Sequence, residues 1–446
     1  MKKKILSIFA AFCCFVSCLS LAGCGEKDTA QVYFLNFKPE SAAVYEELAD
    51  KYKEEKGVTV KVVTAAANNY EQTLKSEIVK SDAPTIFQVN GPIGYNAWKD
   101  YCLDIKDSKL YSFLADKDLA IKEDGGVYAV PYVVEGYGII YNNAIMNRYF
   151  ELENKKTKIS SMEEINSFDT LKAVVDDMSK NLQKLGIKGV FASTSLASGE
   201  DWRWQTHLLN VPLYYEMNDK SDIEDATLGL LDAKEIKHNY SKNFQNLFDL
   251  YINNSVTAKT LLGSKSVADS MAEFALGQVA MVQNGNWAWS QISGVKGNTV
   301  KENDIKMLPI YIGVEGEGGQ GLCIGTENYF AINKNATEEQ QKASLSFLEW
   351  LFSSETGKNY VTEKLGFITP FNTFDENELP NDPLAKEISR YMNDEAVKNI
   401  PWVFTAFPSE TFKKEVGNAL LDYAQGTKKW GDVEKTVIDK WKSERT

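Results

Sequence analysis

The carboxylate of Glu135 is the first group in this chain whose setting indicates chemistry, because it interrupts an apolar, β-rich stretch at residues 125–142 (GGVYAVPYVVEGYGIIYN). Valine, isoleucine and tyrosine favour strands on both sides of it, and Pro131 breaks the ladder of the first strand. Burying a carboxylate is unfavourable unless it accepts hydrogen bonds. Glu135 therefore indicates a cleft that holds a polar ligand or, alternatively, a solvated strand edge. Tyr137, which lies between two glycines, joins it as a candidate ligand-binding residue.

A second candidate segment, GEDWRWQ at residues 199–205, places two tryptophans beside an arginine. Flat indole rings stack on the apolar faces of pyranoses, and charged groups hydrogen-bond to sugar hydroxyls. Trp202, Arg203 and Trp204 are therefore candidates for a surface that faces a sugar. The alternative is the start of a helix whose rings pack in the core.

Length and composition predict a folded protein of two or three domains, since the chain has 446 residues of which 43% are hydrophobic and 12% aromatic. The net charge is −13, and it becomes −16 without the three lysines of the amino-terminal leader. Phosphate binding needs concentrated lysine and arginine, and the sequence has no basic stripe. Nucleic acid is therefore excluded as a partner.

The leader at residues 1–23 has a lysine-rich start and an apolar run that is too short for a stable membrane span. Its end, Leu21-Ala22-Gly23-Cys24, resembles the lipobox of bacterial lipoproteins. That resemblance implies cleavage before Cys24, acylation of this cysteine, and a tether at residues 24–30. Each buried CH₂ group contributes about 0.8 kcal/mol, so several acyl chains would anchor the protein to the outer face of the cell membrane. The alternative is an ordinary secretory leader.

The remaining cysteines and the histidines give no indication of a metal site. Cys102 and Cys323 are the thiols left outside the leader and Cys24, and they either pair or stay as two separate buried thiols. His207 and His238 are far apart, and the sequence has no CxxC or HExxH motif. We therefore expect neither a zinc site nor any cofactor.

The elements after residue 30 begin with a β-α-β pattern. Alternating and apolar runs predict strands at 31–37, 58–63 and 85–89, with a helix between the first two. Ligands bind at the carboxyl ends of strands in α/β sheets. The candidates at these ends are Asn36, Lys38, Glu40, Asn90 and Gly91.

A run at residues 274–289 (FALGQVAMVQNGNWAW) predicts a helix, a glycine break, a buried strand and a corner that carries Trp287. This run and the stretch around Glu135 resemble the extracellular solute-binding proteins (family 1) of carbohydrate ABC importers, and within them the maltodextrin-binding proteins. Those proteins have a similar Phe-x-x-Gly-x-x-Ala-Met and Asn-Gly-x-Trp-Ala-Trp run, and a Pro-x-x-Val-Glu followed by Ile-Tyr-Asn. The resemblance covers nearly all of the chain after Thr29.

The resemblance implies an α/β, two-lobed periplasmic-binding-protein-like fold of type II, with ligand in the cleft between lobes joined by hinge crossings. The first lobe would take residues 30–134 and 315–372, and the second 138–312 and 375–446. Glu135 matches a glutamate that accepts hydrogen bonds from sugar hydroxyls, and Trp287 matches a stacking tryptophan. Further positions that the resemblance places near the ligand are Trp202, Trp204, Lys38, Glu40 and one aromatic of the final platform, for which Phe404 stands beside Trp402 and Phe407.

The sequence departs from the maltodextrin binders after the third strand, where it has Gln88, Asn90, Gly91 and Pro92 in place of a tryptophan and an Asp-Arg pair. This departure disfavours malto-oligosaccharide as the ligand, and sugar binding remains the expectation. We expect a monomer, not an enzyme, that captures an oligosaccharide by domain closure and passes it to ABC permease subunits. The alternatives are a binding lipoprotein for a polyamine or a glycerol phosphodiester, a surface glycosidase that uses Glu135 and Glu200, and an adhesin, for which no repeats are visible.

Overall fold

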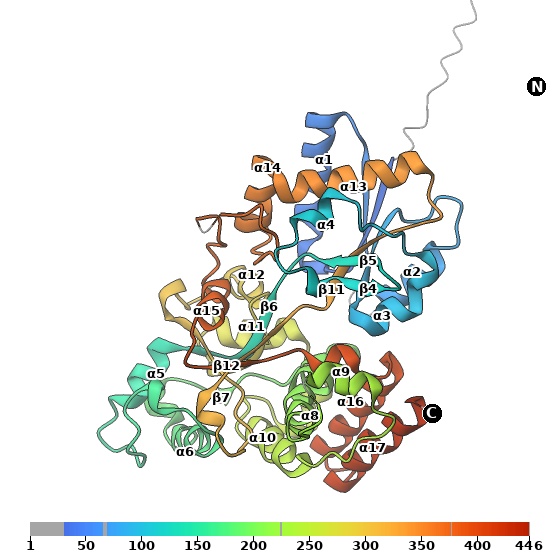
Figure 1. Ribbon diagram of the computed structural model, residues 1–446. Helices are drawn as coiled ribbons and strands as arrows, with labels where there is room; N and C mark the ends of the chain where they lie inside the picture. The colour runs from blue at the N-terminus through green and yellow to red at the C-terminus, as the bar shows by residue number, and fades with distance from the viewer. Residues whose placement is uncertain (1–30, 66–68, 224, 376, 446) are drawn as a thin grey trace, which may run out of the picture.

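The computed structural model describes residues 31–445 except 66–68, 224 and 376, and within them it forms two lobes (Figure 1), each built on a six-stranded sheet. The predicted signal peptide, Cys24 and the tether lie outside the described residues. The lobes have separate hydrophobic cores. None of the described helices is both long and apolar enough to cross a bilayer.

The sheet of the first lobe has the strand order β2-β1-β3-β11-β5-β4. Strand β1 is parallel to β2 and β3, whereas β11 is antiparallel to β3 and β5. The predicted β-α-β opening is confirmed, and its helix ends at Gly57, which takes a left-handed φ of 71°. The strands are β1 (Val32–Asn36), β2 (Val60–Thr64), β3 (Ile86–Asn90), β4 (Ile121–Glu123), β5 (Gly126–Pro131) and β11 (Asn328–Ile332).

Helices cover this first sheet, and the long α13 packs against the outer side of the lobe in Figure 1. Helix α13 comes from late in the sequence, so the first lobe is built from two separate parts of the chain. The helices are α1 (Ala42–Lys56), α2 (Tyr70–Glu77), α3 (Gly91–Trp98), α4 (Lys109–Phe113), α13 (Glu338–Ser353) and α14 (Glu355–Asn359).

The sheet of the second lobe has the order β12-β10-β6-β8-β7, and β9 pairs with β6 as well. Strand β6 is central, all eight of its residues are buried, and its first residue is Glu135. Its neighbours β8, β9 and β10 run antiparallel to it. The strands are β6 (Glu135–Asn142), β7 (Gly189–Phe191), β8 (Val279–Gly285), β9 (Ile305–Leu308), β10 (Gln320–Gly325) and β12 (Lys398–Ile400).

Most of the described helices belong to the second lobe, where α8, α10, α16 and α17 gather on one side (Figure 1). The helices are α5 (Asn143–Phe150), α6 (Phe168–Met178), α7 (Leu182–Leu185), α8 (Leu209–Asn218), α9 (Ala226–Asp232), α10 (Ser241–Asn253), α11 (Val267–Ala275), α12 (Ala288–Ser293), α15 (Pro383–Met392), α16 (Glu410–Ala424) and α17 (Trp430–Arg445).

The described chain crosses between the lobes at residues 131–135, at residues 325–328, and again between α14 and α15. Two of these crossings touch, because the backbone N–H of Val134 donates to the carbonyl of Ile368 over 2.7 Å. The resemblance implied that residues 315–372 belong to the first lobe. Strand β10 instead pairs with β6 and β12 of the second sheet, so this crossing lies after Gly325 rather than near residue 315.

The two described cysteines are free and buried. Cys102 packs in the first lobe and Cys323 lies on β10 of the second, so the alternative of two separate thiols is confirmed. Burial raises the pKa of each thiol to about 12.

Candidate functional site

A buried ion pair joins the end of the first strand to the start of β6. The ammonium of Lys38 donates to both carboxylate oxygens of Glu135, over 2.8 and 2.9 Å, and the two residues are 6% and 3% exposed. Asn36 holds the lysine in place, since its side chain accepts from the Lys38 N–H and donates to the Lys38 carbonyl. The predicted residues Asn36, Lys38 and Glu135 therefore meet where the chain enters the second lobe. Glu40 lies beside them, 3.8 Å from the same ammonium, and its side chain is 26% exposed.

This pairing changes the role expected for Glu135. Its oxygens accept from Lys38, so its charge is matched within the protein, and only its remaining lone pairs are free for a ligand. A carboxylate whose charge is balanced in this way is a poor general base. The ion pair instead holds the start of β6 next to the first lobe.

An aromatic cluster lies in the second lobe at the end of β8. Trp202 and Trp287 are its half-buried members, and their ring centroids are 5.8 Å apart. Trp287 lies two residues after the end of β8, and its ring folds over Gly285, where a Cβ atom would clash with it. The Asn-Gly-x-Trp motif therefore has a steric reason here. Trp202 and Trp287 are the rings of the cluster that keep partial solvent exposure.

Arg203 is fixed against the same cluster. Its guanidinium carbon lies 3.8 Å from the centroid of the Trp202 ring, and its Nε donates to the Asn284 side-chain oxygen over 3.0 Å. Gln283 donates to the Arg203 carbonyl, so two neighbours on β8 hold this residue. The residue is 3% exposed, and burial lowers the pKa of the guanidinium to about 9.

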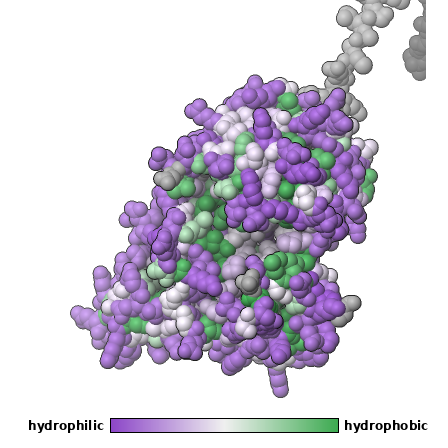
Figure 2. All heavy atoms as spheres, viewed as in Figure 1, coloured by the Kyte–Doolittle hydropathy of each residue, from purple (hydrophilic) through white to green (hydrophobic). Residues whose placement is uncertain are grey.

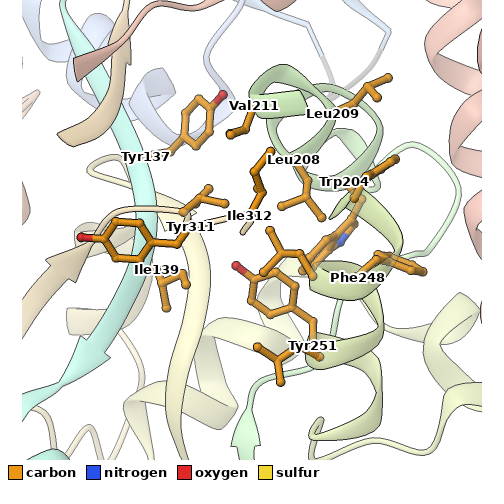
Figure 3. Close-up of a cluster of buried hydrophobic side chains, with 14 of the residues drawn as sticks. Tyr137, Ile139, Trp204, Leu208, Leu209, Val211, Phe248, Tyr251, Tyr311 and Ile312 are labelled. Atoms are coloured by element: carbon orange, nitrogen blue, oxygen red, sulfur yellow. The ribbon is translucent and has the colours of Figure 1, made fainter. Parts of the chain in front are cut away.

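Three of the predicted ligand-binding residues lie in the core behind Trp202 and Trp287 rather than beside them. Trp204 is 3% exposed and packs against Phe248 and Tyr251 in the core (Figure 3), and its indole N–H donates to the carbonyl of Thr194. The expectation that Trp204 faces the cleft is replaced by its stated alternative, a core ring. Tyr137 and Phe404 are also buried and back the cluster from the central strand and from residues 403–406.

The first lobe approaches the cluster through the carboxyl end of β3. Asn90 ends that strand, and Gly91 has a left-handed φ of 61° and lies against Thr405 of the second lobe. Asn328 pairs with Asn90 across the sheet. Figure 2 shows the surface hollowed between the lobes, with apolar patches at its edge.

Buried polar atoms without a hydrogen-bond partner among the described residues occur on both sides of this gap. From the first lobe and its crossing come Asn90 Oδ1, Thr326 Oγ1 and Asn328 Oδ1, and from the second lobe come Arg203 Nη1 and Trp287 Nε1. Such atoms are costly to bury. Similar atoms occur elsewhere among the described residues, for example Tyr45 Oη and both ring nitrogens of His238, so it is the position of these five near the gap that makes them candidates for bonding a polar ligand.

Two cavities, of about 540 and 620 Å³, open elsewhere on the second lobe. One lies beside the glycine-rich loop at residues 312–318 and the other between β9 and α15. No predicted site residue lines either cavity, so the site of interest remains the gap between the lobes.

A sequence profile of the family described as "Bacterial extracellular solute-binding protein" matches residues 47–387. The chain belongs to this family. Solved solute-binding proteins have the same fold. RafE in complex with raffinose is 18% identical, with 93% of this chain and 99% of that chain covered and a TM-score of 0.70. A chitin oligosaccharide binding protein is 17% identical over 93% and 98% of the two chains, with a TM-score of 0.71. Maltose-bound MalE3 of T. maritima is 12% identical over 92% and 99%, with a TM-score of 0.65.

Sequence reasoning on this solute-binding protein missed His207, which was considered only as a metal ligand. The imidazole touches Trp202, Trp287 and Phe404, with centroids 4.8, 5.5 and 5.0 Å away. A π-helical turn at Arg203–Leu208 brings Trp202 and His207, five positions apart, to one face. A search for helical spacings of three and four does not find this pair.

Proposed function

We propose that this solute-binding protein captures an oligosaccharide between its lobes by domain closure and delivers it to the permease of an ABC importer. The observation that carries the proposal is the pair of half-buried indoles, Trp202 and Trp287, packed together near the junction of the lobes, where residues of both lobes have partnerless polar atoms. Stacking rings and scattered hydrogen-bonding groups are what a pyranose ring recognises.

Hydroxyl groups fit the polarity of these atoms on both sides. Asn90, Thr326 and Asn328 supply oxygen atoms, whereas Arg203 and Trp287 supply N–H groups. A hydroxyl can donate to an oxygen and accept from an N–H, so one polyhydroxylated ligand can satisfy both walls. Relatives of the same fold are described in complex with raffinose and maltose, which further supports a sugar.

Closure follows from this division of contacts. A sugar that bonds both walls binds the closed form more tightly than the open form, so binding shifts the population toward closure. The crossings at residues 131–135 and 325–328 are the hinge segments in this proposal. We further propose that Cys24 carries the lipid that holds the protein at the outer face of the bacterial membrane, and that the protein acts as a monomer.

A glycosidase is disfavoured by the partners of its two candidate carboxylates. Glu135 accepts from Lys38, and Glu200 accepts from the backbone N–H of Val267. Each carboxylate thus has a structural partner, whereas hydrolysis needs one acid and one base placed across a glycosidic bond. The proposed protein binds sugar without cleaving it.

The first experiment is a thermal-shift screen of the chain from Lys27 onward. The panel contains malto-, isomalto-, raffinose-type, chito-, xylo- and manno-oligosaccharides, with polyamines and glycerol phosphodiesters as non-sugar solutes. A ligand at about 100 times its Kd adds roughly 2.7 kcal/mol, enough to raise Tm by several degrees. We expect one class of sugar to stabilise the protein.

The matched variants are Trp287→Ala and Trp289→Ala. Trp289 is two positions away and half-buried, but it packs against a different core cluster. The proposal expects the sugar-induced shift to vanish in Trp287→Ala and to persist in Trp289→Ala. A shift with polyamine or phosphodiester alone would contradict the proposed ligand.

A further inference from the structure

Arg203 is a buried cation for which the described residues provide no anionic partner. It is 3% exposed, its Nε bonds to the neutral amide of Asn284, and its Nη1 is buried without a partner. An unpaired buried charge is strongly unfavourable. A protein that keeps such a group beside a binding surface gains from it when a ligand brings the missing charge.

The carboxylates that act on Arg203 from nearby both have other partners. Glu200 accepts from the N–H of Val267 at the start of α11. Glu40 belongs to the other lobe and lies 3.8 Å from the Lys38 ammonium. Both attract the guanidinium, but no carboxylate of the described residues forms an ion pair with Arg203.

The guanidinium is also held ready for a ligand. The Asn284 side-chain oxygen that accepts from its Nε accepts from the Gly285 N–H as well, over 3.0 Å. The face of the guanidinium rests on the Trp202 ring. The group is therefore fixed in plane and in direction, and its fork of N–H donors matches a carboxylate.

We propose that the captured oligosaccharide is acidic, and that the carboxylate of a uronic acid residue binds Arg203 while sugar rings stack on Trp202 and Trp287. This inference rests on the proposed function and names its substrate class. Lys38 offers no second anion site, because Glu135 and Glu40 already surround its ammonium. A monoanionic carboxylate suits the site better than a phosphate dianion, which Glu40 and Glu200 would repel more strongly.

The test compares an acidic oligosaccharide with the same chain after reduction of its carboxylate to a primary alcohol. Titration calorimetry is done with glucuronic-acid-substituted xylo-oligosaccharides and with oligogalacturonates, each beside its reduced form. We expect reduction to weaken binding to the native protein about tenfold or more, because a charge-assisted hydrogen bond is lost. In Arg203→Gln the two forms should bind with similar affinity.

Arg148→Gln is the control, since Arg148 lies on α5 and donates to the Leu185 carbonyl. It should keep the preference for the acidic form. Equal binding of acidic and reduced forms to the native protein would overturn this inference and leave sugar capture standing. Failure of every oligosaccharide, acidic or neutral, would overturn the proposed function itself. The comparison of acidic and reduced ligands on the native protein tests the inference even if Arg203→Gln does not fold.

Discussion

The imidazole of His207 lies parallel to the ring of Tyr137, with centroids 4.1 Å apart and planes 6° apart. The Tyr137 hydroxyl also donates to the His207 carbonyl over 3.0 Å, so the central strand β6 fixes both the backbone and the ring of this histidine. The opposite edge of the cluster is formed by Trp202 and Trp287. Both half-buried indoles therefore pack against one imidazole, and part of their support depends on it.

Replacing His207 tests this dependence. We expect His207→Ala to weaken sugar binding about tenfold, because a cavity beneath both indoles lets them rotate. His207→Phe keeps a flat ring and should bind nearly as the native protein does. Calorimetric titration of both variants is the measurement, and native affinity in His207→Ala would contradict the argument.

Trp202 and Trp204 should respond oppositely to truncation. Trp202 is half-buried in the cluster, whereas Trp204 packs against Phe248 and Tyr251. Trp202→Ala should abolish the sugar-induced thermal shift with a small change in stability. Trp204→Ala should cost about 3–5 kcal/mol of unfolding free energy. Chemical denaturation and thermal shift of the two variants, made side by side, separate the roles; a reversed pattern would refute the assignment.

The same pair of tryptophans shows where sequence reasoning stops. Either tryptophan could form a platform for a sugar ring. The two residues are two positions apart, and this spacing alone does not show which ring faces the core. The π-helical turn that follows Trp202 decides it, and no local pattern in the sequence predicts that turn. The first three strands and their helix could be predicted, because alternation and capping are local signals.

Contacts between residues far apart in the sequence were the other feature that could not be predicted. Lys38 and Glu135 were each predicted as ligand-binding residues, yet they are 97 positions apart in sequence, and only the fold pairs them. The strand β10 was assigned to the wrong lobe for a similar reason. Its apolar residues fit either sheet, and the register that sets Cys323 opposite Tyr137 is a tertiary choice.

The Lys38–Glu135 pair gives a prediction about stability. Lys38→Met leaves a buried carboxylate alone, and Glu135→Gln leaves a buried ammonium with Glu40 at 3.8 Å. We expect each single change to cost about 3 kcal/mol, and the double variant to cost clearly less than their sum. Urea unfolding of the four proteins in this cycle is the measurement. Additive losses would mean that the two groups do not stabilise each other.

Glu327 predicts a pH dependence. Burial raises the pKa of its carboxyl to about 7, with attraction from Lys413 and Lys38 opposed by Glu135 and Glu410. A folded-state pKa above the ordinary value near 4.5 means that this group stabilises the protein fully below pH 4.5 and loses that contribution as pH rises through about 7.

Glu327→Gln removes this titration. The variant should be as stable as the native protein near pH 4.5. At pH 8 its unfolding free energy should be higher than the native value by roughly 1–3 kcal/mol, and its Tm should be higher as well. Thermal unfolding of both proteins across this range is the measurement, and each serves as the reference for the other. A constant difference between them at all pH values would rule out Glu327 as the group responsible.

Gly91 gives a prediction about closure. A Cβ atom at this position would lie 3.0 Å from the Thr405 Cβ on the opposite lobe, and its φ of 61° is unfavourable for other residues. Gly91→Ala should weaken sugar binding, by about tenfold, because the added methyl group opposes the approach of the lobes. Thr405→Gly in that background should restore part of the affinity.

Gly57→Ala is the control, since its φ is 71° and no atom lies within 4 Å of the added Cβ. Gly57→Ala introduces backbone strain without a contact between the lobes, so it should lower Tm without changing Kd. An equal loss of affinity in both alanine variants would show that strain, rather than contact between the lobes, weakens binding.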